Sequence, residues 1–261
     1  IDALTKKVID ETIIDVKFSG ASWKGDQGFF YSSYDKPKGS ELSAKTDTHK
    51  VYFHQLGTKQ SADQLIIGGD DFKRRYMGIG VSDDERFEIL NASEATNGNE
   101  LYIKDLQNKT DFLPIQKGYE FNTDFVDSKG DFIYAMTDKN APNMRLVKFD
   151  IKNPSVWIDV IPETENVLSV STGGGFIFAK YMKDAVTSVK QFNYEGQLIR
   201  TIALPGVGTA GGFSGKEKEK ELYFSFTNYI TPPTIYKFNA DSGKSEVYQK
   251  PKVKFNPENF V

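Results

Sequence analysis

The sequence predicts an all-β fold, a β-propeller of about five four-stranded blades. Apolar runs of about four to six residues are bounded by Gly, Asp, Asn and Pro, which is typical of strands and hairpins. A strand rich in small residues recurs along the chain, and three further strand-like runs follow each copy. The recurrence has a period of roughly 40–45 residues, the length of a propeller blade.

The first repeat shows the pattern most clearly. A small-residue strand is expected at 18–22, an aromatic strand at 29–34, a third strand at 50–55 and a fourth at 64–67. A long hydrophilic loop, 35–48, separates the second strand from the third. Small residues suit the first strand because the innermost strands of a propeller crowd towards its channel.

Four further repeats follow. Their small-residue strands are expected at 78–82, 119–123, 167–171 and 209–213. We therefore expect blades at 18–70, 77–117, 119–162, 167–206 and 208–250. Residues 1–17 are a lead-in or the remnant of a preceding blade. There Val8-Ile9 and Ile13-Ile14 are expected to form an outer strand, with a helical turn as the alternative. Residues 251–261 read as a linker.

Composition excludes several classes of partner. The net charge of −3 is small and mixed in sign, so neither a nucleic acid nor an anionic membrane is expected. No apolar run is long enough to cross a bilayer. Cysteine is absent, which excludes disulfides and Cys-ligated metals. We expect no cofactor and no metal, and a soluble protein whose compartment, cytoplasmic or periplasmic, is left open.

Three motifs occur in a distinctive order: VKFSGASW, then VYFHQLGTKQSAD at 51–63, then MGIGVSDDERF. This order resembles the propeller of the prolyl oligopeptidase family, and the similarity continues through 143–146, 213–215 and 231–236. The block at 51–63 is the most diagnostic, because propeller geometry alone does not require that string.

The resemblance implies a two-domain serine peptidase. In that family a seven-bladed propeller covers the active site of an α/β-hydrolase domain and admits short peptides, which are cleaved after proline. This chain would then be a fragment with about five of the seven blades and without the hydrolase domain, and would itself be non-catalytic. Its expected partners are the hydrolase domain, to which the linker leads, and short proline-containing peptides.

No catalytic residue is expected in the chain. A hydrolase nucleophile needs a G-x-S-x-G elbow, and the nearest string, at 212–216, lacks the second glycine. His54 lies on a strand and is expected to be structural, while His49 lies at a loop end and is expected to be solvated. Asp83-Asp84 is interpreted as a turn. The glycines at 173–175 are interpreted as a tight blade turn, since no P-loop lysine or helix follows.

The resemblance also implies a substrate pocket. Phe18 and Met77 match the family's aromatic and methionine positions that line the peptide site; the alternative is that both are core residues. The position of the family's peptide-binding arginine falls here on Glu94, with Asn97 just beyond it. This departure weakens the expected prolyl preference, and Arg74 or Arg75 are candidate replacements.

Two other functions stay open on the sequence. The chain could be a separate propeller that binds a peptide or protein, because fold does not dictate function. The other alternative is a five-bladed propeller glycosidase, which would need carboxylates converging on the propeller axis. We also expect that five blades taken from a ring of seven form an open arc, which self-associates through exposed blade edges.

Overall fold

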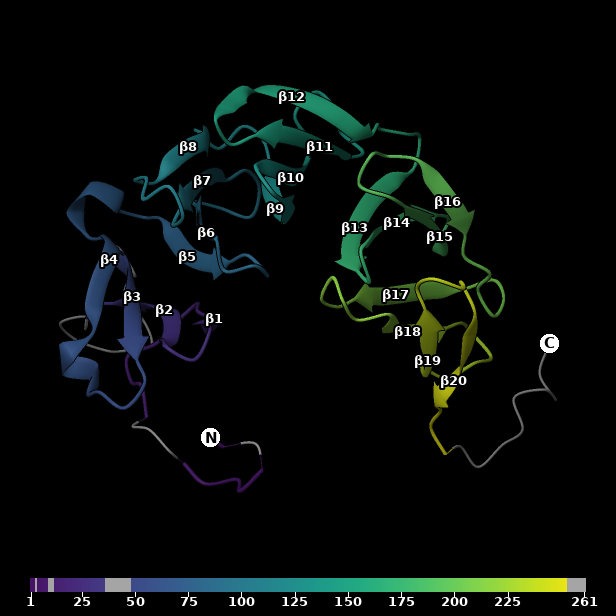
Figure 1. The fold of residues 1–261 in the computed structure, drawn as a ribbon, viewed down its shortest axis with the longest axis horizontal. Coiled ribbons are helices and arrows are strands. Elements are labelled where there is room, and N and C mark those ends of the chain that lie inside the picture. The colour runs from purple at the N-terminus through teal and green to yellow at the C-terminus, as the bar shows by residue number, and fades with distance from the viewer. Residues whose placement is uncertain (3, 9–11, 36–47, 253–261) are drawn as a thin grey trace. The chain divides into compact units, whose positions relative to one another are not determined.

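The computed structural model describes residues 1–2, 4–8, 12–35 and 48–252 (Figure 1). These residues form five antiparallel sheets of four strands each, and each sheet keeps its strands in chain order. The predicted all-β class of four-stranded blades is therefore confirmed. Two compact units, 1–124 and 125–261, are described separately below as unit one and unit two.

Unit one holds two sheets. The first contains β1 (Ser22–Lys24), β2 (Gly28–Tyr34), β3 (His49–Gln55) and β4 (Gln64–Gly68). The second contains β5 (Tyr76–Val81), β6 (Phe87–Ser93), β7 (Glu100–Asp105) and β8 (Leu113–Gln116). Two short 3-10 helices, η1 (Gln60–Ala62) and η2 (Asp70–Phe72), lie before and after β4.

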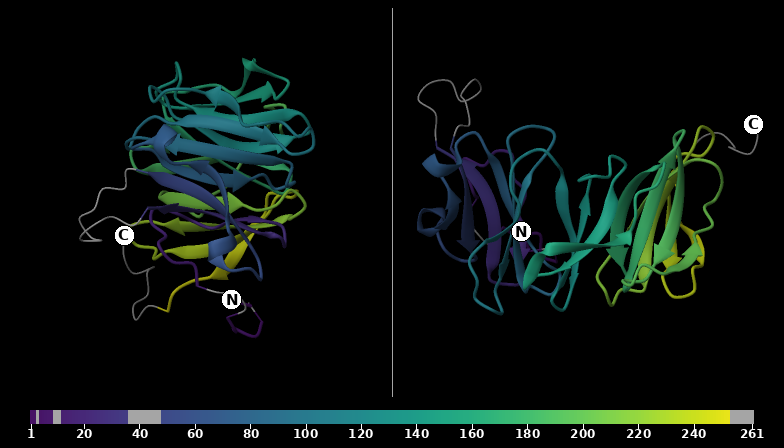
Figure 2. Two further views of the ribbon diagram at one scale, coloured as in Figure 1. Left: turned by 90° about the vertical axis from the view of Figure 1, so that its left-hand side faces the viewer. Right: turned by 90° about the horizontal axis from the view of Figure 1, so that it is seen from above.

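Unit two holds three sheets, seen from two further directions in Figure 2. Its first sheet begins two residues before the unit, with β9 (Thr123–Lys129), β10 (Phe132–Thr137), β11 (Arg145–Asp150) and β12 (Asn153–Ile161). The next contains β13 (Val167–Gly173), β14 (Phe176–Lys183), β15 (Val186–Phe192) and β16 (Leu198–Thr201). The last contains β17 (Thr209–Ser214), β18 (Glu221–Thr227), β19 (Thr234–Asn239) and β20 (Ser245–Gln249).

Alternating burial along the strands creates the cores. In β18, Leu222, Phe224 and Phe226 are buried while Tyr223 is exposed, as the period of two in a strand requires. The buried side packs on Phe178 of the preceding sheet. Stacked rings fill this core, which places large apolar area between neighbouring sheets of unit two.

Two predicted first strands are wrong. The strand expected at 18–22 begins only at Ser22, because Phe18 has a φ of +54°, which strand geometry does not allow. The strand expected at 119–123 begins at Thr123. Asn99 holds the segment before it: its backbone N–H donates to the Phe121 carbonyl and its side chain bonds the backbone of Thr123.

The lead-in is also different from the prediction. Val8, Ile13 and Ile14 lie in neither a strand nor a helix, and Ile9 falls outside the described residues. The one bridge described in this segment pairs Val16 with Ser33 of β2. Most of the hydrophilic loop, 36–47, and most of the expected linker, 253–261, also fall outside the described residues. Within the described chain no helix is long and apolar enough to span a membrane.

Candidate functional site

The structure brings Phe18 next to the strand that carries Met77. The Phe18 ring packs edge-on against Tyr76 at 5.1 Å between centroids, and Tyr76 directly precedes Met77 in β5. Phe18 is 61% exposed, whereas Met77 is 3% exposed and lies in the core of unit one. The core interpretation therefore fits the Met77 side chain and does not fit Phe18.

His49 links these two positions, a role that the sequence did not reveal. Its Nδ1 accepts the Met77 N–H at 2.9 Å, and its Nε2 lies 3.1 Å from the carbonyl oxygen of Lys17, the neighbour of Phe18. The two bonds require a neutral ring with its proton on Nε2. The prediction of a solvated His49 is wrong, because the side chain is fully buried in β3. Burial lowers the pKa of His49 and outweighs the hydrogen bond to Lys17, which raises it.

A second cluster surrounds Glu94 and Arg75. The Arg75 Nη1 lies 3.2 Å from Glu100, and its Nε lies 3.9 Å from Glu94. Its guanidinium also lies over the rings of Phe72 and Tyr119, at 5.4 and 5.7 Å from their centroids. Arg75 is thus a fixed cation beside the predicted contact residue.

Buried Glu100 completes this cluster, and nothing in the sequence pattern singles it out. It accepts hydrogen bonds from the Tyr102 hydroxyl at 3.0 Å and from the Gly118 N–H at 3.2 Å. Burial, with the nearby Glu100 charge, raises the pKa of Tyr119 to about 12. Burial also raises the pKa of Tyr102, and the hydrogen bond to Glu100 adds to this effect.

Asn97 lies apart from the arginine contacts. Its side-chain oxygen accepts a hydrogen bond from Asn122 at 2.8 Å, and both residues are in connecting loops. Asn97 is exposed, as is half of the Glu94 side chain. The structure therefore presents Glu94 and Asn97 on one surface loop between β6 and β7. Of these two residues, Glu94 contacts Arg75 and Asn97 contacts Asn122.

The diagnostic block at 51–63 forms a buried polar network. His54 Nδ1 lies 2.8 Å from Asp63 Oδ1, with both side chains almost fully buried, and the Tyr31 hydroxyl donates to the other Asp63 oxygen at 2.7 Å. Gln60 donates to the Ile14 carbonyl and accepts the Ile14 N–H. The string thus anchors the lead-in to the first sheet, and the structural interpretation of His54 agrees with this geometry.

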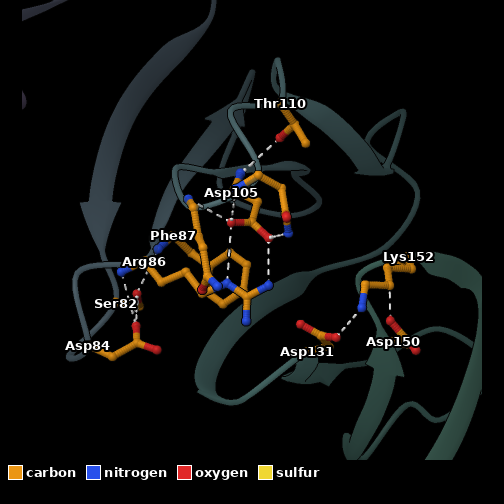
Figure 3. A network of polar contacts seen from close by, with 11 residues as sticks. Ser82, Asp84, Arg86, Phe87, Asp105, Thr110, Asp131, Asp150 and Lys152 are labelled. Carbon is orange, nitrogen blue, oxygen red and sulfur yellow. Dashed lines mark hydrogen bonds and ion pairs between the residues drawn. The ribbon is translucent and has the colours of Figure 1, made fainter.

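The pair Asp83-Asp84 lies in a turn, as expected. Figure 3 shows Asp84 accepting hydrogen bonds from the Ser82 hydroxyl at 2.6 Å and from the Arg86 N–H at 3.2 Å. Arg86 in turn makes a two-bond contact with Asp105, at 3.2 and 2.7 Å. Burial alone would raise the pKa of Asp105, but the bonds from Arg86 and Asn108 outweigh it and lower the pKa to about 2.

A separate ion pair links two hairpin ends in unit two. The Lys152 ammonium contacts Asp131, and the Lys152 N–H donates to Asp150 at 2.8 Å (Figure 3). Such contacts fix turns. Among the described residues no group of three or more His, Asp or Glu side chains could hold a metal ion.

The chain offers no serine peptidase centre in its described part. Both of its histidines are buried within unit one, bonded to Met77 and to Asp63. Ser214 ends strand β17 next to a register shift in the sheet, not on a strand-to-helix elbow. The expected tight turn at 173–175 is present, with φ values of +61° and +83° at Gly174 and Gly175.

Comparison with known proteins decides the family. The profile described as "Prolyl oligopeptidase, N-terminal beta-propeller domain" matches residues 1–251. The chain belongs to the prolyl oligopeptidase propeller family. Its relatives include the prolyl endopeptidases of Elizabethkingia miricola and Elizabethkingia meningoseptica, 66% and 64% identical over the whole of this chain. The chain spans 37% of the length of each.

Solved structures of this family share the fold. A prolyl endopeptidase structure, from work on inter-domain dynamics in catalysis and specificity, matches 94% of this chain and 36% of its own with a TM-score of 0.86 and 29% identity. Prolyl oligopeptidase B from Galerina marginata, bound to a 35-residue hydrolysis and macrocyclization substrate, matches with a TM-score of 0.84. It covers 94% of this chain and 36% of its own at 20% identity, and therefore supports the fold alone.

Proposed function

We propose that this chain is the substrate-gating propeller of a prolyl endopeptidase, a serine peptidase that cleaves short peptides after proline. The observation that carries the proposal is the 66% identity to a prolyl endopeptidase over the full length of the chain. The chain itself is non-catalytic in this account, because both histidines are committed to buried contacts. Its partners are the α/β-hydrolase part of the enzyme and proline-containing peptides.

In this proposal Phe18, Glu94 and Asn97 face the peptide, and Met77 is buried in the core of unit one. Phe18 supplies an exposed aromatic surface for an apolar peptide side chain. Arg75 stands beside Glu94, and its guanidinium, which also pairs with Glu100, supplies N–H donors for a peptide backbone at this position. His49 is a positioning residue, since it holds the backbone at Lys17 and at Met77 in one arrangement.

The test compares the full-length enzyme with this chain alone on a chromogenic peptide that releases its reporter after proline. We expect cleavage by the full-length enzyme, inhibition by a serine-directed reagent, and no cleavage by the chain alone. In the full-length enzyme, Phe18→Ala should raise KM several-fold. A matched control, Tyr229→Ala, removes a fully exposed ring from the connection between β18 and β19 and should leave KM unchanged. Equal effects of the two variants would count against Phe18 as a pocket residue.

A further inference from the structure

Lys180 is a half-buried cation that has no counter-ion in the part of the chain that the structure describes. It lies in β14 and, among the described residues, no carboxylate is within ion-pair distance of its ammonium group. Five other lysines in the described part of unit two do contact carboxylates. These are Lys129, Lys152, Lys183, Lys220 and Lys237. Burying an unpaired charge is costly, so a lysine retained there needs an explanation.

The contacts of Lys180 place its ammonium between two first strands. Its Nζ donates to the Ser171 hydroxyl in β13 at 3.2 Å and approaches the Gly212 carbonyl oxygen in β17 at 3.5 Å. The Ser171 hydroxyl donates to the same Gly212 oxygen at 2.8 Å. An ammonium has three N–H donors, so one is left for a further acceptor. Strands β13 and β17 are neighbours in unit two (Figure 1).

A β-bulge in β17 lies at the Gly212 carbonyl that Lys180 and Ser171 contact. The β17–β18 register shifts between Gly212 and Ser214, where Phe213 has a φ of +64° and Gly212 a φ of +120°. A Cβ on Gly212 would lie 2.6 Å from the Tyr223 carbonyl oxygen, so only glycine fits. Bulges interrupt a ladder and often lie beside functional sites. Here the Gly212 carbonyl oxygen bonds to the neighbouring sheet.

We propose that the Lys180 ammonium, positioned by the Ser171 hydroxyl, forms a carboxylate-binding site beside the first strands β13 and β17 of unit two. The first strand of each blade lines the central channel of a propeller, and Ser171 and Gly212 both belong to first strands. A carboxylate is the acceptor that the ammonium lacks, and it would form a charge-assisted hydrogen bond there. The proposal rests on the proposed peptidase function for its ligand, a peptide carboxylate.

Two sources of carboxylate are distinguishable, an acidic side chain and a free C-terminus. The experiment uses the full-length enzyme and peptides without proline, so that no cleavage is needed. Lysine acetylation by an amine-reactive reagent is followed at each site by mass spectrometry. Three peptides are compared: one with a glutamate and an amidated C-terminus, one neutral with a free C-terminus, and one neutral and amidated.

We expect at least one carboxylate-bearing peptide to slow acetylation of Lys180 several-fold, while the neutral amidated peptide has no effect. Lys190, on the adjacent strand and over the Tyr181 ring, is the internal control and should keep its rate. Equal protection by all three peptides, or protection by none, would overturn the proposal. The acetylation rate does not depend on catalysis. Its result therefore tests the carboxylate site separately from the peptidase assay, which tests the proposed function.

Kinetics with cleavable peptides give a second measurement. Lys180→Gln should raise KM about tenfold for the favoured carboxylate-bearing peptide and leave the neutral peptide unchanged, the size expected for one charge-assisted hydrogen bond. Lys180→Arg keeps the charge and should restore most of the affinity, and Lys190→Gln should change neither peptide. A loss of the same size for charged and neutral peptides would indicate a structural role for Lys180 and contradict the proposal.

Discussion

At the scale of single residues, the neutral ring of His49 connects two backbone segments. One ends at Lys17, next to Phe18, and the other contains Met77. Protonation of Nδ1 would abolish its bond from the Met77 N–H. Because the pKa of His49 is lowered by burial, the unfolded chain binds this proton at a higher pH than the folded chain. The stability that the buried ring contributes is therefore present above the unfolded pKa, about 6.5, and is lost as pH falls below it.

This gives a prediction for the pH dependence of unfolding. The free energy of unfolding of wild type and of His49→Gln, measured in urea, should differ most at pH 7.5 and progressively less towards pH 5. The variant lacks the titrating ring, which is why its own curve should be flatter in this window. A difference that stays constant from pH 7.5 to pH 5 would show that His49 does not titrate on unfolding.

The second prediction concerns the buried His54–Asp63 pair. Asp63→Ala removes the carboxylate that contacts both His54 and Tyr31. It should destabilise the protein by about 3–5 kcal/mol, because the buried partner of the deleted carboxylate is left without a counterpart. Asp26→Ala, in the exposed turn before β2, is the matched control and should stay within about 0.5 kcal/mol. Chemical denaturation measures both; comparable losses would contradict the role of the network.

At the scale of elements, the loop between β6 and β7 depends on one glycine. Gly98 has a φ of +78°, and a Cβ there would lie 1.9 Å from the Tyr119 carbonyl oxygen. Gly98→Ala should destabilise the protein by about 2 kcal/mol or more and displace the Glu94–Asn97 loop. Gly78→Ala in β5, where nothing lies within 4 Å of the added carbon, should cost far less. Thermal unfolding of the two variants checks the ranking.

Much of the element pattern was predictable because strands follow local signals. The period of the sequence and its turn residues indicated four-stranded repeats, and the first strands near 78, 167 and 209 were found there. Strands were wrongly predicted to begin near 18 and 119. The aromatic residues there belong to connecting segments that are held by tertiary hydrogen bonds, such as those of Asn99. Local composition does not encode those bonds.

The candidate site was less predictable for a related reason. Arg75 and Glu94 are 19 positions apart and meet only when the sheet β5–β8 forms. The burial of His49 and the counter-charge of Glu100 likewise depend on partners from other strands. The resemblance supplied the positions Phe18 and Met77, but it could not indicate that one ring is exposed and the other side chain buried.

At the scale of the whole molecule, sheet faces with exposed aromatic rings bear on association. The first sheet exposes Trp23, which packs on Phe29, and the last exposes Tyr223, which packs on Tyr248. We predict that the chain alone self-associates through such surfaces, whereas the full-length enzyme buries them. Sedimentation velocity should show concentration-dependent association of the chain alone, reduced by Trp23→Ser. A monomer at all concentrations would contradict this prediction.

The central claim, that this propeller gates a prolyl endopeptidase, is tested most directly by the dependence of cleavage on substrate size. The full-length enzyme is given one proline-containing sequence in peptides of increasing length and in a disordered protein. We predict that kcat/KM falls steeply from the short peptides to the long chain, because the propeller excludes large substrates. Equal rates across all lengths, or cleavage by this chain alone, would contradict the account.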